Sequence, residues 1–318
     1  VAYACSTQNY FDYSAEFPDG LYLCWRHSMS QPTKVACTLM QVKTLQAARV
    51  VRGLDLRQPM NSSTLKALRS TWLEHQLLVM PDQAIAITDL ERFAHSMGPY
   101  GEDPYFEAMP GHPHVAQVRR EANETTRIFA EAWHSDWSFM ASPPAATVLL
   151  GSVIPPHGGN TLFANQYAAW DALPDDVKLR LRDAMGIHSA RRGYARDGAY
   201  GEKDKQAGRS MAIRYDDSAL KTQLQPIARV HPETGRTALY VSPGYTLGIE
   251  GWSERDSQDM LMFLFEHQTR SAFVYSHPWS ADMLVMWDNR CLIHAATGGY
   301  EGHRRLLHRI TIAERHLS

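Results

Sequence analysis

The chain has 318 residues, of which 44% are hydrophobic and 21% charged, and its formal net charge is −2. This composition allows a sizeable buried core, and the charge gives no electrostatic basis for binding nucleic acid or an anionic membrane. No run of about 18 apolar residues is present, so no membrane span is predicted. The N-terminus lacks a charged region followed by an apolar one, so we expect no signal peptide and a cytoplasmic location.

Residues 1–40 show no steady helical or strand period, and we predict an irregular N-terminal extension. Three of the four cysteines lie within it (Cys5, Cys24 and Cys37). A disulfide among these three stays open, although reduced thiols are the simpler interpretation. We predict that residues 41–318 form a single domain.

The first regular elements of this domain alternate between strand and helix. The apolar pattern predicts a strand within residues 45–56 and helices over 64–75 and 88–97, with Asn61 and Thr88 near the helix starts. Leu77-Leu78-Val79-Met80, stopped by a proline, is typical of a buried strand.

Short strands dominate the middle of the chain. Residues 115–118, 145–153 and 161–163 have strand patterns, whereas residues 165–184 are helical and broken by Pro174. Residues 189–221 are polar, glycine-rich and charged. So long a segment is either a lid over a site or disordered, and both interpretations stay open.

The last third repeats this pattern of short strands with one long helix. We predict one helix over residues 256–268. We also predict five strands, at residues 228–230, 238–241, 273–275, 283–287 and 307–313. Many short strands with a few covering helices indicate one β-rich α+β domain.

The first candidate site residues are His134 and Asp136. On an extended strand, residues two apart point to the same face and offer one nitrogen and one oxygen, two ligands of a 2-His-1-carboxylate metal site. The pair alone is weak, because a chain with 15 histidines contains roughly one such pair by chance. His231 and Glu233 match the same pattern, but their proline-glycine turn disfavours metal binding.

His294 is the best candidate for the third ligand, because it follows a strand and a turn. Arg305 and Arg309 come shortly after it, and strand alternation would place both on one face. A metal beside two guanidinium groups suits ligands that carry carboxylates. The alternative is that these arginines only decorate an edge strand.

Together these residues form a pattern that resembles the Fe(II)/2-oxoglutarate dioxygenases of the taurine dioxygenase and chlorophenoxyacetate dioxygenase family. The resemblance runs from about residue 45 to residue 313. It is carried by four motifs in order: His134 with Asp136; Gly158-Gly159-Asn160-Thr161; Trp287-Asp288-Asn289-Arg290 with His294; and Arg304-Arg305-Leu306-Leu307-His308-Arg309.

The resemblance implies a double-stranded β-helix (jelly-roll) core with flanking helices, and a homo-oligomer, dimer or tetramer. It implies Fe(II) held by His134, Asp136 and His294, with O₂ and 2-oxoglutarate as cosubstrates. Arg305 and Thr161 would bind the distal carboxylate of 2-oxoglutarate. The enzyme would hydroxylate a small organic anion and release succinate and CO₂.

The same resemblance places the anionic group of the substrate on Arg309, with Asp103 and Tyr105 nearby. Two departures from the taurine pattern, Ala130 for an asparagine and Asp103 for a histidine, make taurine a poor candidate. Other stretches are more similar to enzymes of aryloxyalkanoates, so we expect a carboxylate with an apolar or aromatic body. The aromatic residues expected at its pocket are Tyr105, Phe106, Phe129, Trp137 and Tyr245.

Three alternatives remain. A sulfonate or alkyl sulfate dioxygenase of the same family would differ only in its substrate. A zinc hydrolase also uses two histidines and a carboxylate, but it has no use for Arg305 beside Thr161. A catalytically inactive jelly-roll binding protein would be expected to have lost one of the site residues.

Overall fold

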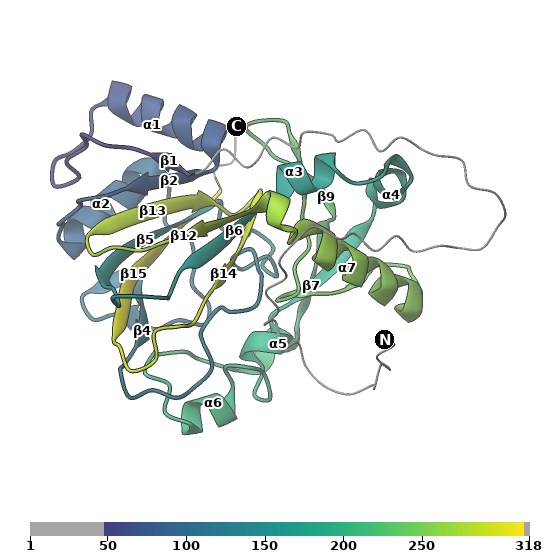
Figure 1. The fold of residues 1–318 in the computed structure, drawn as a ribbon. Coiled ribbons are helices and arrows are strands. Elements are labelled where there is room, and N and C mark those ends of the chain that lie inside the picture. Colours follow the sequence, from purple (N-terminus) through teal and green to yellow (C-terminus); the bar gives the residue numbers. More distant parts are fainter. Residues whose placement is uncertain (1–47, 315–318) are drawn as a thin grey trace, which may run out of the picture. The chain divides into compact units, whose positions relative to one another are not determined.

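A computed structural model describes residues 48–314, which all belong to one compact unit of residues 42–318. The expected extension, residues 1–40, lies outside the described residues, and so do its three cysteines. Helices and strands are mixed throughout the described part, as expected for the α+β class (Figure 1). None of its helices combines the length and the apolar character that a bilayer span requires.

The largest sheet has seven strands, which are antiparallel apart from the parallel pair β1–β2. Its strands, in spatial order, are β1 (Arg49–Val50), β2 (Leu77–Met80), β13 (Met283–Asp288), β5 (Ala146–Val153), β15 (Arg305–Ile312), β4 (His112–Arg120) and β3 (Ala108–Met109). Segments more than 200 residues apart in sequence, such as β2 and β13, are therefore direct neighbours.

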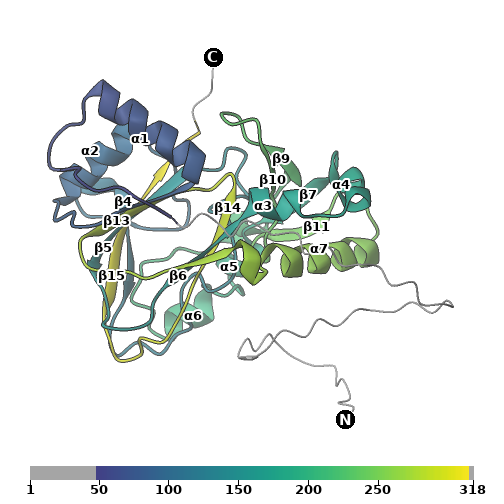
Figure 2. The ribbon, with the colours of Figure 1, turned by 45° about the horizontal axis from the view of Figure 1, so that its top comes forward.

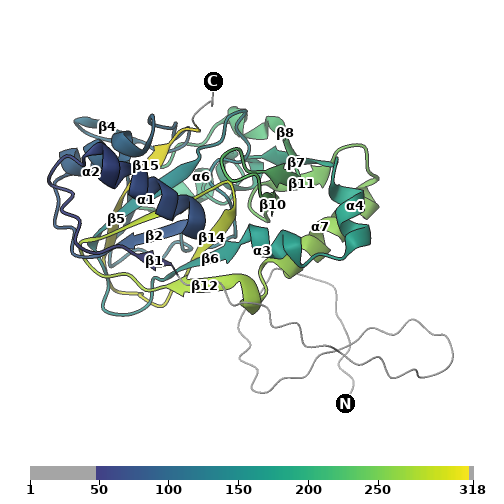
Figure 3. The same cartoon turned by 90° about the horizontal axis from the view of Figure 1, so that it is seen from above.

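Helices α1 (Ser62–His75) and α2 (Ile87–Met97) cover one face of this sheet (Figure 3). The Asn61 side chain caps α1 by accepting the Thr64 N–H at 2.8 Å. Thr88 lies inside α2 rather than at its cap, and the Asp89 carboxylate accepts the Ala86 N–H instead. Trp72, Leu90 and other apolar side chains of the helices pack against alternate residues of the sheet, which fixes its register.

The opposite face of the large sheet packs on a second sheet of three antiparallel strands, β12 (Val274–His277), β6 (Thr161–Asn165) and β14 (Leu292–Ala296). Figure 2 shows the two sheets beside each other. Phe163 and Leu292 of the small sheet meet Val285 and Leu307 of the large one.

The remaining elements form a separate layer. Proline 174 divides the expected helical stretch into α3 (Gln166–Asp171) and α4 (Asp175–Leu181), as predicted. Next to them lie α7 (Glu254–Gln268), the hairpin β9 (Ala228–Val230) and β10 (Thr237–Leu239), and the sheet β11 (Thr246–Ile249), β7 (Met185–Ser189) and β8 (Thr222–Pro226). This last sheet was not predicted from the sequence.

Residues 189–221 are folded rather than disordered. They contain the short helices α5 (Arg191–Tyr194) and α6 (Glu202–Gln206) and the 3-10 turn η1 (Asp217–Leu220); a second 3-10 turn, η2 (Ser271–Phe273), precedes β12. Tyr194, Met211 and Ile213 are buried against Phe106 and Trp137. Apolar side chains that are widely spaced in this polar segment therefore anchor it to the domain.

Candidate functional site

His134 and His294 meet across a single pair of backbone hydrogen bonds. The His134 N–H donates to the His294 carbonyl at 3.0 Å, and the His294 N–H donates to the His134 carbonyl at 2.8 Å. His294 is the central residue of β14, but residues 133–136 do not form the strand that was expected. The backbone pairing, and not strand alternation, therefore places the two rings together, with 4.2 Å between their centroids.

Asp136 completes a cluster in which the three ligand atoms lie within 4.8 Å of one another. Its Oδ1 is 3.6 Å from His134 Nε2 and 3.8 Å from His294 Nε2. All three side chains are buried. Two imidazole nitrogens and one carboxylate oxygen that converge on one point form the donor set of a divalent transition metal, and this set leaves open coordination positions.

The surroundings hold each ligand in a metal-binding form. His134 Nδ1 donates to the Ala132 carbonyl at 2.8 Å, which leaves its Nε2 free to coordinate. Burial, with the neighbouring His134, lowers the pKa of His294 to about 3, so its ring is neutral. Burial alone would raise the pKa of Asp136, but the Arg309 guanidinium and the two histidines hold it well below the usual value.

The second oxygen of Asp136 points away from the two histidines. Thr147 on β5 donates to this Oδ2, and Arg309 Nη2 lies 3.1 Å from it. Asn289 in turn donates to the Thr147 hydroxyl at 2.9 Å. The carboxylate is thus oriented from behind, as metal-ligating carboxylates commonly are.

Arg305 on β15 is a buried cation without a buried counter-charge. It is 6% exposed, and Nη2 donates to the Gly159 carbonyl at 3.1 Å. Its Nε has no partner, and no carboxylate within residues 48–314 forms an ion pair with it. Burial lowers its pKa, as expected for a cation removed from water. Such a group is stabilised by an anionic ligand.

Thr161 supplies a hydroxyl beside this guanidinium. Trp279 Nε1 donates to Thr161 Oγ1 at 3.0 Å, so within the described residues the hydroxyl hydrogen is not used. The same Trp279 ring lies 6.0 Å from the centre of the Arg305 guanidinium. The pair therefore offers donors that could bind a carboxylate.

The two glycines before Thr161 are required by geometry. Gly158 and Gly159 have φ of +67° and +66°, where L side chains are strained. A Cβ on Gly158 would lie 2.3 Å from the Gly299 carbonyl oxygen, and one on Gly159 would lie 3.2 Å from Arg305 Nε. The Gly-Gly turn thus lets the backbone approach both the facing loop and the guanidinium.

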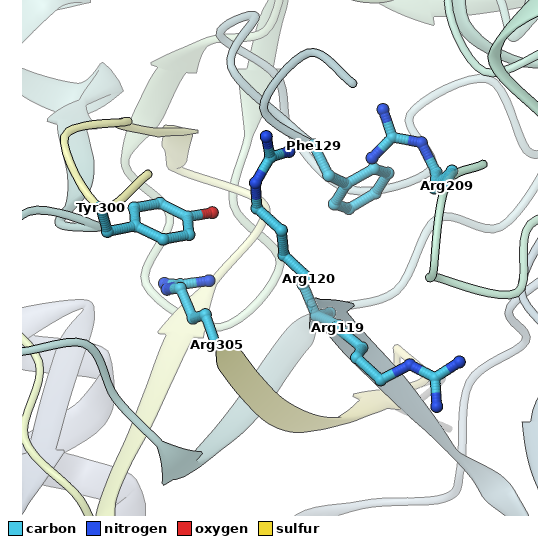
Figure 4. Close-up of a pocket in the computed structure, with 7 residues that line it drawn as sticks. Arg119, Arg120, Phe129, Arg209, Tyr300 and Arg305 are labelled. Carbon is cyan, nitrogen blue, oxygen red and sulfur yellow. The ribbon is translucent and has the colours of Figure 1, made fainter. Parts of the chain in front are cut away.

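Arg120 lines the same pocket as Arg305, together with Phe129, Arg209 and Tyr300, and no role was assigned to it from the sequence. It lies directly opposite Arg305 on the paired strands β4 and β15. Figure 4 shows Arg305 beside the Tyr300 ring, with Arg120 reaching past them, whereas Arg119 points away. Arg120 already has a carboxylate partner, Glu124, at 3.6 Å. The position of Arg120 beside Arg305 follows from the pairing of β4 with β15, which local sequence does not reveal.

Arg309, which was expected to receive the substrate anion, already has a carboxylate partner, Asp103. Its Nη1 donates to Asp103 Oδ1, and its Nη2 faces Asp136. It is 4% exposed and lies beside the T-shaped pair of rings of Phe106 and Trp137, at 5.0 and 5.1 Å from their centroids. The two predicted substrate residues Asp103 and Arg309 are thus brought together, as partners of each other.

The aromatic residues expected near the metal do gather there, but only two of them line the open pocket. A cavity of about 170 Å³ opens beside His134, with walls that include Phe129, Tyr194, Tyr200 and Tyr245. Tyr105 does not line it. It stacks on Tyr194 at 4.5 Å and bonds to Ser218, so it supports the wall from behind.

A second group of possible metal ligands, His231, Asp288 and Cys291, is explained by hydrogen bonds within the protein. His231, expected to lie in a turn, is buried, and its Nε2 is bonded to Asp288 Oδ2 at 3.0 Å. Asp288 also receives three hydrogen bonds from Arg290, one of them from its backbone N–H, and Arg290 Nη1 donates to Glu233 at 2.8 Å. Every group in this network is therefore already paired, which leaves no ligand set for a metal beside Cys291.

Comparison with known proteins agrees with the site. The family model described as "Taurine catabolism dioxygenase TauD, TfdA family" matches residues 41–311. A crystal structure of a putative alpha-ketoglutarate-dependent taurine dioxygenase from Burkholderia xenovorans superposes with a TM-score of 0.69 at 28% identity. That superposition covers 85% of this chain and 90% of the other.

Two curated proteins are also similar over most of the chain. An (S)-phenoxypropionate/alpha-ketoglutarate-dioxygenase of Sphingobium herbicidovorans is 29% identical over 83% of this chain and 91% of its own length. An alpha-ketoglutarate-dependent 2,4-dichlorophenoxyacetate dioxygenase of Cupriavidus pinatubonensis is 30% identical over 82% and 92%.

Proposed function

Because this chain belongs to the taurine catabolism dioxygenase TauD, TfdA family, we propose that it oxidises a C–H bond of a small organic molecule. The protein is an oxidoreductase, an Fe(II)- and 2-oxoglutarate-dependent dioxygenase that uses O₂. In the reaction that we propose, 2-oxoglutarate is decarboxylated to succinate and CO₂ while the substrate is hydroxylated.

The observation that carries this proposal is the unpaired Arg305 guanidinium beside the three converging ligands. Fe(II) would be held by His134, Asp136 and His294, and it supplies the redox chemistry that activates O₂. Arg305 would bind the distal carboxylate of 2-oxoglutarate, with a hydrogen bond from Thr161. A buried cation without a counter-ion is costly, so a site that keeps one is built for an anion.

The chain's own residues orient these groups and keep water away. The Ala132 carbonyl fixes the tautomer of His134, while Thr147 and Arg309 aim Asp136. The burial of all three ligands excludes bulk water, which protects reactive species from side reactions.

The expected aryloxyalkanoate-like substrate has two parts, and the structure supports only one of them. An apolar or aromatic body fits the cavity of about 170 Å³ that the aromatic side chains line. A substrate carboxylate bound to Arg309 is not supported, because the Asp103 carboxylate already forms an ion pair with that guanidinium. The same argument applies to a sulfonate or an alkyl sulfate.

Two finer structural expectations remain proposals. We propose that the seven-stranded sheet and the sheet of β12, β6 and β14 together form the double-stranded β-helix, or jelly roll, that the family resemblance implies. We also propose that residues 189–221 act as a lid, because Tyr194 and Tyr200 of this segment line the cavity beside His134. Movement of such a segment would admit substrate and then close the site.

A metal hydrolase is the main alternative from another class. Zinc would accept the same ligands, but hydrolysis does not require the Arg305 guanidinium or the Thr161 hydroxyl. An inactive binding protein would not need three intact metal ligands with a supported carboxylate.

The test is an anaerobic titration of the protein with Fe(II) and then with 2-oxoglutarate, followed by succinate release on admission of air. We expect both to bind, and His134→Ala to weaken Fe(II) binding by at least about 100-fold because one of three protein ligands is lost. His157→Ala, at an exposed histidine, is the matched control. Activity that needs zinc and ignores 2-oxoglutarate would overturn the proposal.

A further inference from the structure

We infer that Asp103 takes the place of a substrate anion, so that the substrate presents an uncharged or cationic hydrogen-bond donor to this end of the site. The inference rests on the proposed function and specifies its substrate class. The donor would be a hydroxyl, an amide N–H or an ammonium group on an otherwise apolar substrate; Asp103 itself is not among the residues that line the aromatic cavity.

The first support is the way Asp103 is bound. A single oxygen, Oδ1, receives the Arg309 Nη1–H and the Trp137 Nε1–H, the latter at 2.7 Å. The carboxylate is thus fixed by two donors from different elements, and its side chain is 15% exposed. Charge-assisted bonds of this kind are among the stronger ones in proteins.

The second support is that Arg309 has little freedom to leave this partner. Phe106 and Trp137 lie against its guanidinium, and Asp136 Oδ2 lies 3.1 Å from its other terminal nitrogen, which makes no hydrogen bond within the described residues. An incoming anion would have to displace the Asp103 carboxylate from a buried cation. The displaced carboxylate would then be left partly buried without its counter-charge, which is strongly unfavourable.

The third support is the balance of formal charge. Summed over the site, the charges of Fe(II) and of dianionic 2-oxoglutarate cancel each other, and Asp103 and Asp136 together cancel Arg305 and Arg309. Without Asp103 the site would keep one positive charge for a substrate anion to balance. An anionic substrate would add an unbalanced negative charge to a buried site, and such sites discriminate strongly against it.

The fourth support is the acceptor that remains. Within the described residues, no hydrogen bond is made to the second oxygen of Asp103, because both of its donors reach Oδ1. A carboxylate oxygen without a donor accepts hydrogen bonds and donates none. It therefore selects for a substrate with an N–H or O–H group.

Three probes with the same aromatic body test the inference: phenoxyacetate, 2-phenoxyethanol and 2-phenoxyethylamine. Each is titrated calorimetrically into anaerobic protein loaded with Fe(II) and 2-oxoglutarate. We expect the alcohol and the amine to bind wild-type protein at least about tenfold more tightly than the carboxylate does, because only the carboxylate meets an unmatched negative charge.

Asp103→Asn then removes the charge with little change of shape. It should strengthen phenoxyacetate binding by about tenfold and weaken binding of the amine, because Arg309 is released. Asp55→Asn, at an exposed aspartate paired with Arg57, should change neither. Should Asp103→Asn not fold, the ranking of the probes on wild-type protein still decides.

The inference is overturned if phenoxyacetate binds wild-type protein as tightly as the other two probes, if neither of those binds, or if Asp103→Asn leaves the ranking unchanged. These outcomes are distinct from a failure of the proposed function. That failure would be seen one step earlier, as absent Fe(II) or 2-oxoglutarate binding before any probe is added.

Discussion

The metal ligands were predicted from one feature of the sequence, but a different feature of the structure positions them. His134 and Asp136 were predicted as neighbours on a strand face, yet their segment pairs with β14 at only one residue. The sequence order of the ligands carried the prediction, because it matches a family pattern. The backbone pairing of His134 with His294, which brings the rings together, involves residues 160 positions apart and has no local signal.

Arg305 yields a prediction about cosubstrate affinity. Arg305→Gln should raise the KM for 2-oxoglutarate by about 10²-fold or more, because a buried charge-assisted contact to the distal carboxylate is lost. Arg305→Lys should recover only part of the loss, because an ammonium group cannot reproduce the planar fork. Steady-state kinetics with varied 2-oxoglutarate measures both effects.

The neighbouring arginine provides the control for this prediction. Arg304 is exposed and pairs with Glu121 at 3.2 Å. Arg304→Gln should therefore leave the KM for 2-oxoglutarate within about twofold of wild type, since exposed ion pairs contribute little. Equal effects of the two glutamine substitutions would show that Arg305 acts only through general charge.

At the scale of elements, the Gly158-Gly159 turn gives a prediction about stability. Gly158→Ala combines a positive φ with a Cβ that would lie 2.3 Å from the Gly299 carbonyl oxygen, so the turn must shift. We expect a loss of about 2 kcal/mol or more in the free energy of unfolding, measured by denaturant titration.

A second glycine separates the two causes. Gly208 has φ of +87°, but a Cβ there would meet nothing within 4 Å. Gly208→Ala therefore carries the backbone strain without the clash, and its cost should be about 1 kcal/mol. If both variants lose the same stability, the close approach to Gly299 has no energetic weight.

The segment 189–221 shows where element prediction fails. Its polar, glycine-rich composition is typical of a loop, but the buried Tyr194, Met211 and Ile213 fix it to the aromatic cluster. The strand β7, which enters this segment, was also missed, because its five residues have no clear period and are stabilised by β8 and β11 far along the chain. Pairing at long range overrides local pattern in such cases.

At the scale of the whole molecule, the mixed class and most elements of the large sheet were predictable, because β2, β5 and β13 contain short apolar runs that are typical of buried strands. The arrangement was not. The strand order, with β13 between β2 and β5, is a property of long-range pairing. The Asp103–Arg309 pair has the same origin, since it joins residues 206 positions apart. Sequence therefore predicts the reaction class better than the substrate.

The buried histidines lead to a last prediction, on the pH dependence of folding. His277 is 2% exposed, and neither of its ring nitrogens has a partner within the described residues. Burial lowers its pKa to about 4. In the unfolded chain a histidine takes up a proton near pH 6.5, so between pH 6.5 and 4 the unfolded state binds the proton and the folded state does not. The free energy of unfolding should therefore fall as the pH is lowered through this window.

The magnitude follows from linkage. A single group contributes up to about 1.4 kcal/mol per pH unit, or about 3 kcal/mol across the window. His277→Phe removes the buried titrating group, so its stability should fall less steeply between pH 6.5 and 4 than that of wild type in urea titrations. His157→Phe, at an exposed position, should keep the wild-type slope. Parallel curves for wild type and His277→Phe would mean that the pKa of His277 is the same in the folded protein and in the unfolded chain.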